Sequence, residues 1–139
     1  MKTKIVASVL LAAVMVVVSL AVARNAAAAP NVTFNVLTPL PANMVAGQTY
    51  DFVVEVTSNT EFISVMAQPS QFYPGRYLTA QGVSRDGAGT STLIIVTYTA
   101  KSSTADLPGG VAPVSVTVGV RFQGGAVIVQ RYDYNVSVP

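Results

Sequence analysis

Apolar and polar residues alternate with a period of two through most of the chain after residue 30. The stretches 32–36, 50–56, 114–122 and 132–138 each carry an apolar side chain at nearly every second position. Side chains of a β-strand point alternately to the two faces of its sheet, so each stretch predicts a strand with one face on a core. Such strands are typical of antiparallel sheets.

Three further strands are expected from less regular stretches. Residues 92–98 are apolar on both faces, as in a strand that is covered on both sides, and weaker patterns occur at 61–67 and 77–83. Residues with turn chemistry separate the strands. They cluster at 39–43, 46–48, 58–59, 73–75, 85–89, 107–110 and 123–125. Seven strands in about 110 residues, with no helix for a parallel crossover, predict an all-β fold, an immunoglobulin-like antiparallel β-sandwich.

The pleat fixes the register of the last hairpin. A two-residue turn would set the core-facing Val118 opposite the solvent-facing Arg131, which the alternation forbids. A three-residue loop over 123–125 pairs Val120 with Ile128, and both apolar faces then coincide. We expect a type I turn closed by a left-handed glycine.

Two segments resemble parts of secreted prokaryotic Ig-like modules. Residues 45–59, which read Val-Ala-Gly-Gln-Thr-Tyr-Asp-Phe-Val-Val-Glu-Val-Thr-Ser-Asn, look like the second strand of those modules. Residues 107–111, Leu-Pro-Gly-Gly-Val, lead into an alternating strand that is similar to their penultimate one. The resemblance implies an Ig-like fold in an extracellular setting. It carries over no functional residue, because such modules serve adhesion, spacing, polymer building and sugar binding alike.

The beginning of the chain is laid out as an export signal. Lys2 and Lys4 precede an apolar run over 5–23, and four alanines follow at 26–29. This pattern predicts a signal-peptide helix that is cleaved after Ala28, or after Ala23, and a domain over residues 29–139. The alternative is a retained membrane anchor, since about nineteen residues at 1.5 Å rise span about 28 Å. A cleaved chain would be secreted, extracellular or periplasmic, with no membrane contact.

Composition removes most kinds of catalytic site. The chain has no Cys and no His, so disulfides, thiolate nucleophiles, Ser-His dyads and the usual zinc sites are excluded. Asp51 and Glu55 share a strand face about 13 Å apart, beyond the ~5–9.5 Å of a glycosidase pair. Residues 85–90 hold one carboxylate, Asp86, too few for a calcium loop. We therefore expect no enzyme, no cofactor and no metal site.

Charge argues against nucleic acid as a partner. From residue 29 onward the chain has five basic and six acidic side chains, a net charge of −1. The basic isoelectric point therefore belongs to the leader, and the domain lacks the positive surface that phosphates require.

The most distinctive loop chemistry lies at residues 68–77. Aromatic side chains on loops provide contact area for sugar rings or for partner proteins. The candidate ligand-binding residues are Phe72, Tyr73, Arg76 and Tyr77. In the alternative interpretation, Phe72 and Tyr77 seal one end of the core. Asn31 and Asn135 begin glycosylation sequons on solvent-facing strand positions.

These observations favour an exported, non-enzymatic β-sandwich with a structural or adhesive role at the cell surface or outside the cell. The alternative is a small binding module for carbohydrate or a partner protein that uses the 68–77 loop. Self-association by strand addition is expected to involve residues 31–37, since this strand is tied to the domain only through the Pro39 and Pro41 segment. After residue 29 the only lysine is Lys101, so few charges protect the sheet edges.

Overall fold

The computed structural model describes residues 30–71, 75–82 and 84–139, and its strands are all antiparallel. The predicted signal-peptide helix lies outside these residues. In the described part of the chain the elements are β1 (Val32–Thr38), β2 (Thr49–Gln71), β3 (Leu78–Gln81), β4 (Ser84–Ala100), a short 3₁₀ turn (Pro108–Gly110), β5 (Ala112–Phe122) and β6 (Val127–Val136). The prediction of an all-β antiparallel fold is confirmed.

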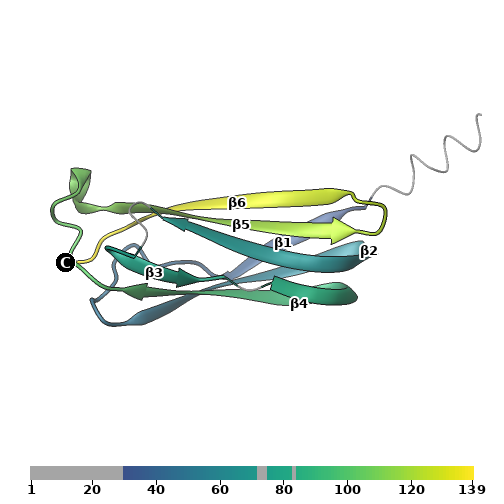
Figure 1. Cartoon of the computed structure of the whole chain (residues 1–139), viewed down its shortest axis with the longest axis horizontal. Helices are drawn as coiled ribbons and strands as arrows, with labels where there is room; N and C mark the ends of the chain where they lie inside the picture. Colours follow the sequence, from purple (N-terminus) through teal and green to yellow (C-terminus); the bar gives the residue numbers. More distant parts are fainter. Residues whose placement is uncertain (1–29, 72–74, 83) are drawn as a thin grey trace, which may run out of the picture. The chain divides into compact units, whose positions relative to one another are not determined.

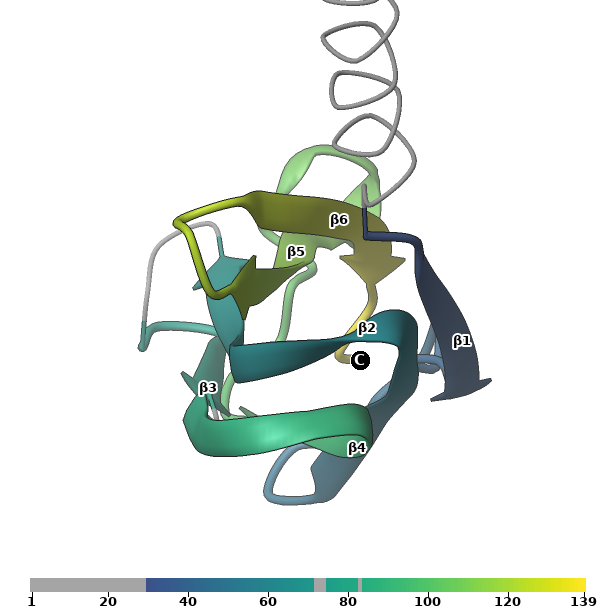
Figure 2. The same ribbon diagram turned by 90° about the vertical axis from the view of Figure 1, so that its right-hand side faces the viewer.

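The six strands form one sheet that folds back on itself at β2 (Figures 1 and 2). The first half of β2 lies between β1 and β4, and β3 continues beyond β4. The second half of β2 pairs with β5, which pairs with β6. Figure 2 shows the β5–β6 part above the β4 part, with β2 passing from one to the other. β1, β3 and β6 are the edge strands.

The expected count of about seven strands was wrong by one. The strands predicted at 50–56 and 61–67 are a single strand, β2, because residues 58–61 shift the register against β4 instead of reversing the chain. Asn59 marks this irregularity, and its Oδ1 accepts a hydrogen bond from the backbone of Asn31 at 2.8 Å. Asn is therefore used here to hold β1 against β2 and not to close a turn.

The turn predicted at residues 85–89 was also wrong, since the whole segment lies within β4. The reason lies in the strand pairing, since residues 84–89 continue the ladder with β2 and Gly89 lies opposite Phe62. A Cβ atom at Gly89 would lie 3.6 Å from the Phe62 ring, an ordinary packing distance, so no close contact requires glycine here. Pairing with β2 therefore keeps this glycine-containing segment extended.

The core lies between the two parts of the folded sheet. The alternating positions of β5 that were expected to face it, Val116, Val118 and Val120, are fully buried. Tyr132 and Tyr134 of β6 share this side, and their rings lie 5.2 and 6.0 Å from the ring of Phe52, on the facing half of β2. Aromatic pairs at such distances add to the stabilisation from burial. The predicted face assignment is confirmed.

The last hairpin has the predicted register but a different turn. Val120 pairs with Ile128, and Phe122 donates its backbone N–H to Ala126 at 2.9 Å. Gly124 and Gly125 both have positive φ, +97° and +94°. A positive φ at the second central residue is the mark of a type II turn, whereas type I needs a negative one. Two glycines after Gln123 make this turn accessible.

Candidate functional site

The 68–77 segment contributes to the core as well as to the surface. Gln71 ends β2, and Phe72 and Tyr73 lie outside the described residues. Tyr77 is only 2% exposed, and its hydroxyl donates to Asp106 at 2.9 Å. Arg76 contacts the same carboxylate at 3.2 Å and lies 5.0 Å over the Tyr77 ring. Tyr77 thus seals one end of the core, as the alternative interpretation predicted, while Arg76 stays exposed.

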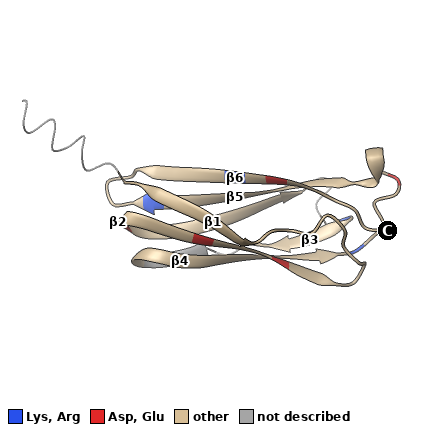
Figure 3. Ribbon diagram, turned by 180° about the vertical axis from the view of Figure 1, so that it is seen from behind, with Lys and Arg blue, Asp and Glu red and all other residues tan. Residues whose placement is uncertain are grey.

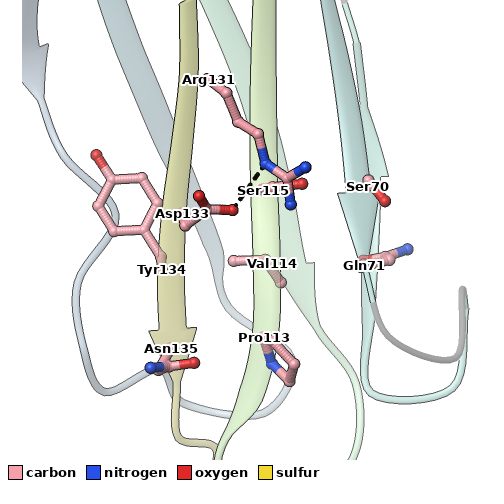
Figure 4. Close-up of a pocket in the computed structure, with 9 residues that line it drawn as sticks. All are labelled: Ser70, Gln71, Pro113, Val114, Ser115, Arg131, Asp133, Tyr134 and Asn135. Carbon is pink, nitrogen blue, oxygen red and sulfur yellow. Dashed lines mark hydrogen bonds and ion pairs between the residues drawn. The ribbon is translucent and has the colours of Figure 1, made fainter.

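A hollow of about 340 Å³ lies close to the first part of this segment (Figure 4). It is formed where the ends of β2, β5 and β6 lie side by side. Its lining residues are Ser70, Gln71, Pro113, Val114, Ser115, Arg131, Asp133, Tyr134 and Asn135. Arg131 donates from Nε to Asp133 at 2.9 Å, and both side chains are mostly exposed. Hydroxyl, amide, guanidinium and carboxylate groups therefore converge there, a set that can hydrogen-bond a polyhydroxylated ligand or a peptide.

Sequence reasoning missed this hollow. Ser70 and Gln71 belong to the 68–77 segment, but Arg131 was named only for its register and Asn135 only as a sequon. Ser70 and Ser115 become neighbours because β2 pairs with β5 in one particular register. That pairing joins residues about 45 positions apart, and alternation alone gives no long-range register.

Most of the apolar residues that pack only partly against the core lie on the edge strands. Most of the core is completely enclosed, but eight hydrophobic residues are only partly buried against it. Three are on β1 (Val32, Phe34, Val36), three on β6 (Ile128, Tyr132, Tyr134), one on β3 (Ala80), and the eighth is Tyr50 near the start of β2. The inner faces of β1 and β6 are therefore open to further packing.

The outer edge of β6 is paired only near its end. Ser137 donates its N–H to Ala42 and accepts from Met44, both at 2.8 Å, which forms an isolated parallel bridge at Asn43. Between Val127 and Asn135 no described strand pairs with this edge. Unpaired strand edges are templates for association with other chains.

Few charges protect these edges (Figure 3). β1 and β3 contain no charged residue, and β6 contains only the Arg131–Asp133 pair. Near the hairpin, Val127 and Val129 of β6 are more than half exposed. Charges, particularly lysines, are the usual means by which natural proteins block edge pairing.

The remaining sequence candidates are placed at the surface. Asn31 and Asn135 are exposed. Asp51 accepts a hydrogen bond from Thr97 at 2.7 Å, and Glu55 is half-buried on the same face. No three Asp or Glu residues of the described ranges gather as a metal site would require.

Burial perturbs three tyrosines. Desolvation raises the pKa of Tyr98, whose side chain is fully enclosed, to about 12. Its hydroxyl donates to the Ser115 carbonyl at 3.3 Å. Burial also raises the pKa values of Tyr132 and Tyr134, and the nearby Tyr134 raises that of Tyr132 further. All three are neutral hydroxyls at neutral pH, suited to hydrogen bonding.

Comparisons with known proteins give likenesses among solved structures alone. No protein-family model matches the chain, and no curated protein matches it. Among solved structures, the chain is similar to one described as "AvmM Catalyzes Macrocyclization in Alchivemycin A Biosynthesis", with a TM-score of 0.44 and 12% identity. The match covers 78% of this chain and 90% of the other.

That structure belongs to a catalyst, which contradicts the expectation that the chain is not an enzyme, and the expectation is withdrawn. The physical reason for the correction is that the exclusion considered only nucleophiles and acid–base groups of the commonest types. At this TM-score and identity the likeness carries no argument for any particular activity.

Separately, no helix among the described residues has the length and apolar character needed to cross a bilayer.

Proposed function

We propose that the chain is an exported Ig-like β-sandwich with a structural or adhesive role at the cell surface or outside the cell. Strand order supports the Ig-like part of the proposal. One side has the order β1-β2-β4-β3 and the other has β2-β5-β6. These correspond to the ABED and CFG sheets of a constant-type Ig domain if β2 supplies both B and C.

The observation that carries the structural role is the state of the two edge strands β1 and β6. Both have an apolar inner face that is only partly covered, and of the charges that usually prevent edge pairing β1 has none and β6 has only the Arg131–Asp133 pair. In a domain that acts as a monomer, such edges are usually covered by another element or carry charged residues. A module that joins a larger assembly gains from leaving them open.

β1 is suited to strand exchange between copies. It pairs with β2 alone, and residues 39–48 connect the two strands. Leu40 and Met44 of this connection are buried, so it stays anchored if β1 leaves. A neighbouring copy could then supply the equivalent strand to the vacated edge of β2, and repetition of this step builds a filament.

Deletion of residues 29–38 from the exported protein tests this exchange. We expect the truncated protein to be less stable and to regain stability when a synthetic peptide of residues 30–38 is added. A peptide of the same composition in scrambled order is the control. A truncated protein that is as stable and as monomeric as the intact one would contradict the exchange.

Export itself is tested by the mass of the native protein. The Lys2–Lys4 region, the apolar run and the Ala26–Ala28 site support cleavage after Ala28, with Ala23 as the second site. Intact-mass analysis of the culture medium and the envelope fraction should find a chain beginning at Ala29 or Arg24. A chain that retains Met1 and stays in the membrane fraction would make the leader an anchor.

The second candidate function is binding of carbohydrate or a partner protein at the hollow between β2, β5 and β6. Its convergent polar groups favour this function. Ser70→Tyr would fill the hollow, whereas Gln68→Tyr places the same ring on the same face of β2 outside it. Binding on an oligosaccharide array that survives Gln68→Tyr and is lost in Ser70→Tyr supports a sugar site. Wild-type protein that binds no glycan on the array contradicts it.

A further inference from the structure

We propose that two copies of this chain pair antiparallel through the outer edges of β6, about a two-fold axis at Tyr132. The proposal rests on the structural role proposed above and identifies one interface that would serve it. It does not require β1 to leave its own domain. The partner is a second copy of the same chain, because the edge is complementary to itself.

The backbone groups on this edge can be assigned from the hydrogen bonds at the two ends of β6. At one end the carbonyl of Ala126 points toward β5, where it accepts from Phe122. At the other end the N–H and carbonyl of Ser137 point away from β5, toward residues 42–44. Backbone groups alternate between the two edges of a strand. Odd-numbered residues from Val127 to Asn135 therefore direct their donors and acceptors to the free edge.

Charge selects the register of the pair. Side chains of Arg131 and Asp133 lie on the outer face, two residues apart, and are mostly exposed. In an antiparallel pair centred on Tyr132, Arg131 of each copy lies opposite Asp133 of the other. A pair centred on Arg131 would set two arginines opposite each other, and one centred on Asp133 would oppose two aspartates. Like charges directly opposite are destabilising, so both of those registers are disfavoured.

Side chains on the inner face fit the same register. Tyr132 lies opposite Tyr132 of the second copy, at a position without direct backbone hydrogen bonds, where side chains approach most closely. Aromatic pairs across strands are among the stabilising ones. Gln130, which is exposed although it lies opposite the buried Val118, comes opposite Tyr134 of the second copy. The half-covered tyrosines thereby gain neighbours.

A two-fold pair explains why so small an edge carries one charge of each sign. With the two-fold axis at Tyr132, Arg131 of each copy lies opposite Asp133 of the other. A single axis therefore forms two ion pairs, as in an isologous interface. A different partner protein would need a matching pattern of its own. The exposed pair Arg131–Asp133 thus protects the edge against unrelated strands and permits the second copy.

Charge exchange between two variants tests the proposal. Arg131→Asp gives a copy with two acidic side chains at these positions, and Asp133→Arg gives a copy with two basic ones. We expect dimerisation of the exported wild-type protein in sedimentation equilibrium and at least tenfold weaker dimerisation of each variant alone. The mixture should form a one-to-one heterodimer, because every opposed pair is again of opposite sign.

Arg121→Asp is the matched control, since it makes the same change on the outer face of the interior strand β5. It should dimerise as the wild type does, and melting curves check that each variant is folded. Wild-type protein that stays monomeric at all concentrations would overturn the proposal, as would variants that dimerise normally alone. The readout does not depend on export or on β1. If this dimerisation test fails, the proposed function is still tested separately by the deletion and mass experiments.

Discussion

Val118 is the residue whose environment the alternation defines most clearly. It is fully buried and lies between Ala67 of β2 and Gln130 of β6 in the register. Its neighbour Thr117 points to the outer face, near Gln68 and Arg131. A one-residue step along β5 therefore separates the core from solvent.

Substitution by aspartate should distinguish these two positions. Val118→Asp buries an unpaired charge and should lower the free energy of unfolding by at least about 3 kcal/mol, whereas Thr117→Asp should cost less than about 1 kcal/mol. Urea denaturation of the two variants measures both values. Equal losses would show that the two faces of β5 have been assigned wrongly.

Tyr98 gives the fold a specific sensitivity to alkaline pH. Its pKa of about 12 lies above the value of 10 for an unfolded tyrosine, so the folded state holds the proton longer. The stabilisation is complete below pH 10 and should be lost between pH 10 and 12, by about 1.4 kcal/mol per pH unit. Tyr98→Phe should remove this part of the slope and leave the smaller contribution of Tyr132 and Tyr134. Denaturation curves from pH 9 to 12 that have the same slope for both proteins would refute the assignment.

At the scale of the element, alternation predicted strands well and connections poorly. The faces and register of β5 and β6 follow from the sequence because a slip of one residue would turn Val118 into the solvent. The continuity of β2 through Ser58 and Asn59 does not follow from the sequence. The same residue types serve in turns and in irregular strand pairs, and only the tertiary contact with Asn31 separates the two.

Two glycines of the β5–β6 hairpin should respond oppositely to alanine. Gly124 has a φ of +97°, which residues with a side chain rarely adopt. Gly124→Ala should therefore lower the free energy of unfolding by about 1 kcal/mol. A Cβ at Gly119 would lie 3.5 Å from Met66 and 4.0 Å from Val129, ordinary packing distances. Gly119→Ala should therefore be neutral or stabilising by up to about 1 kcal/mol. Thermal melts of both variants check this, and a tolerated Gly124→Ala would argue against the observed turn.

The candidate site was predictable only where it is local. The aromatic residues at 68–77 marked a segment that does contribute to one end of the molecule, and Tyr77 of this segment is buried in the core. The hollow and the pairing of Tyr77 with Asp106 depend on contacts between strands that are distant in sequence. No local pattern carries that information.

At the scale of the whole molecule, the domain completes its core everywhere except at its edges. Which strands become edges is a property of the strand order, and the sequence does not specify that order locally. Half-covered inner faces on β1 and β6, together with the scarcity of charge, connect the fold to a role in assembly.

Amide hydrogen exchange of the exported protein, measured in dilute and in concentrated solution, tests this central claim most directly. Backbone amides of Val129, Arg131 and Asp133 face the free edge, whereas those of Gln130 and Tyr132 are bonded to β5 and should exchange slowly in both samples. Association through β6 predicts that the three edge amides exchange at least tenfold more slowly in the concentrated sample. Identical rates for these amides at all concentrations would contradict it.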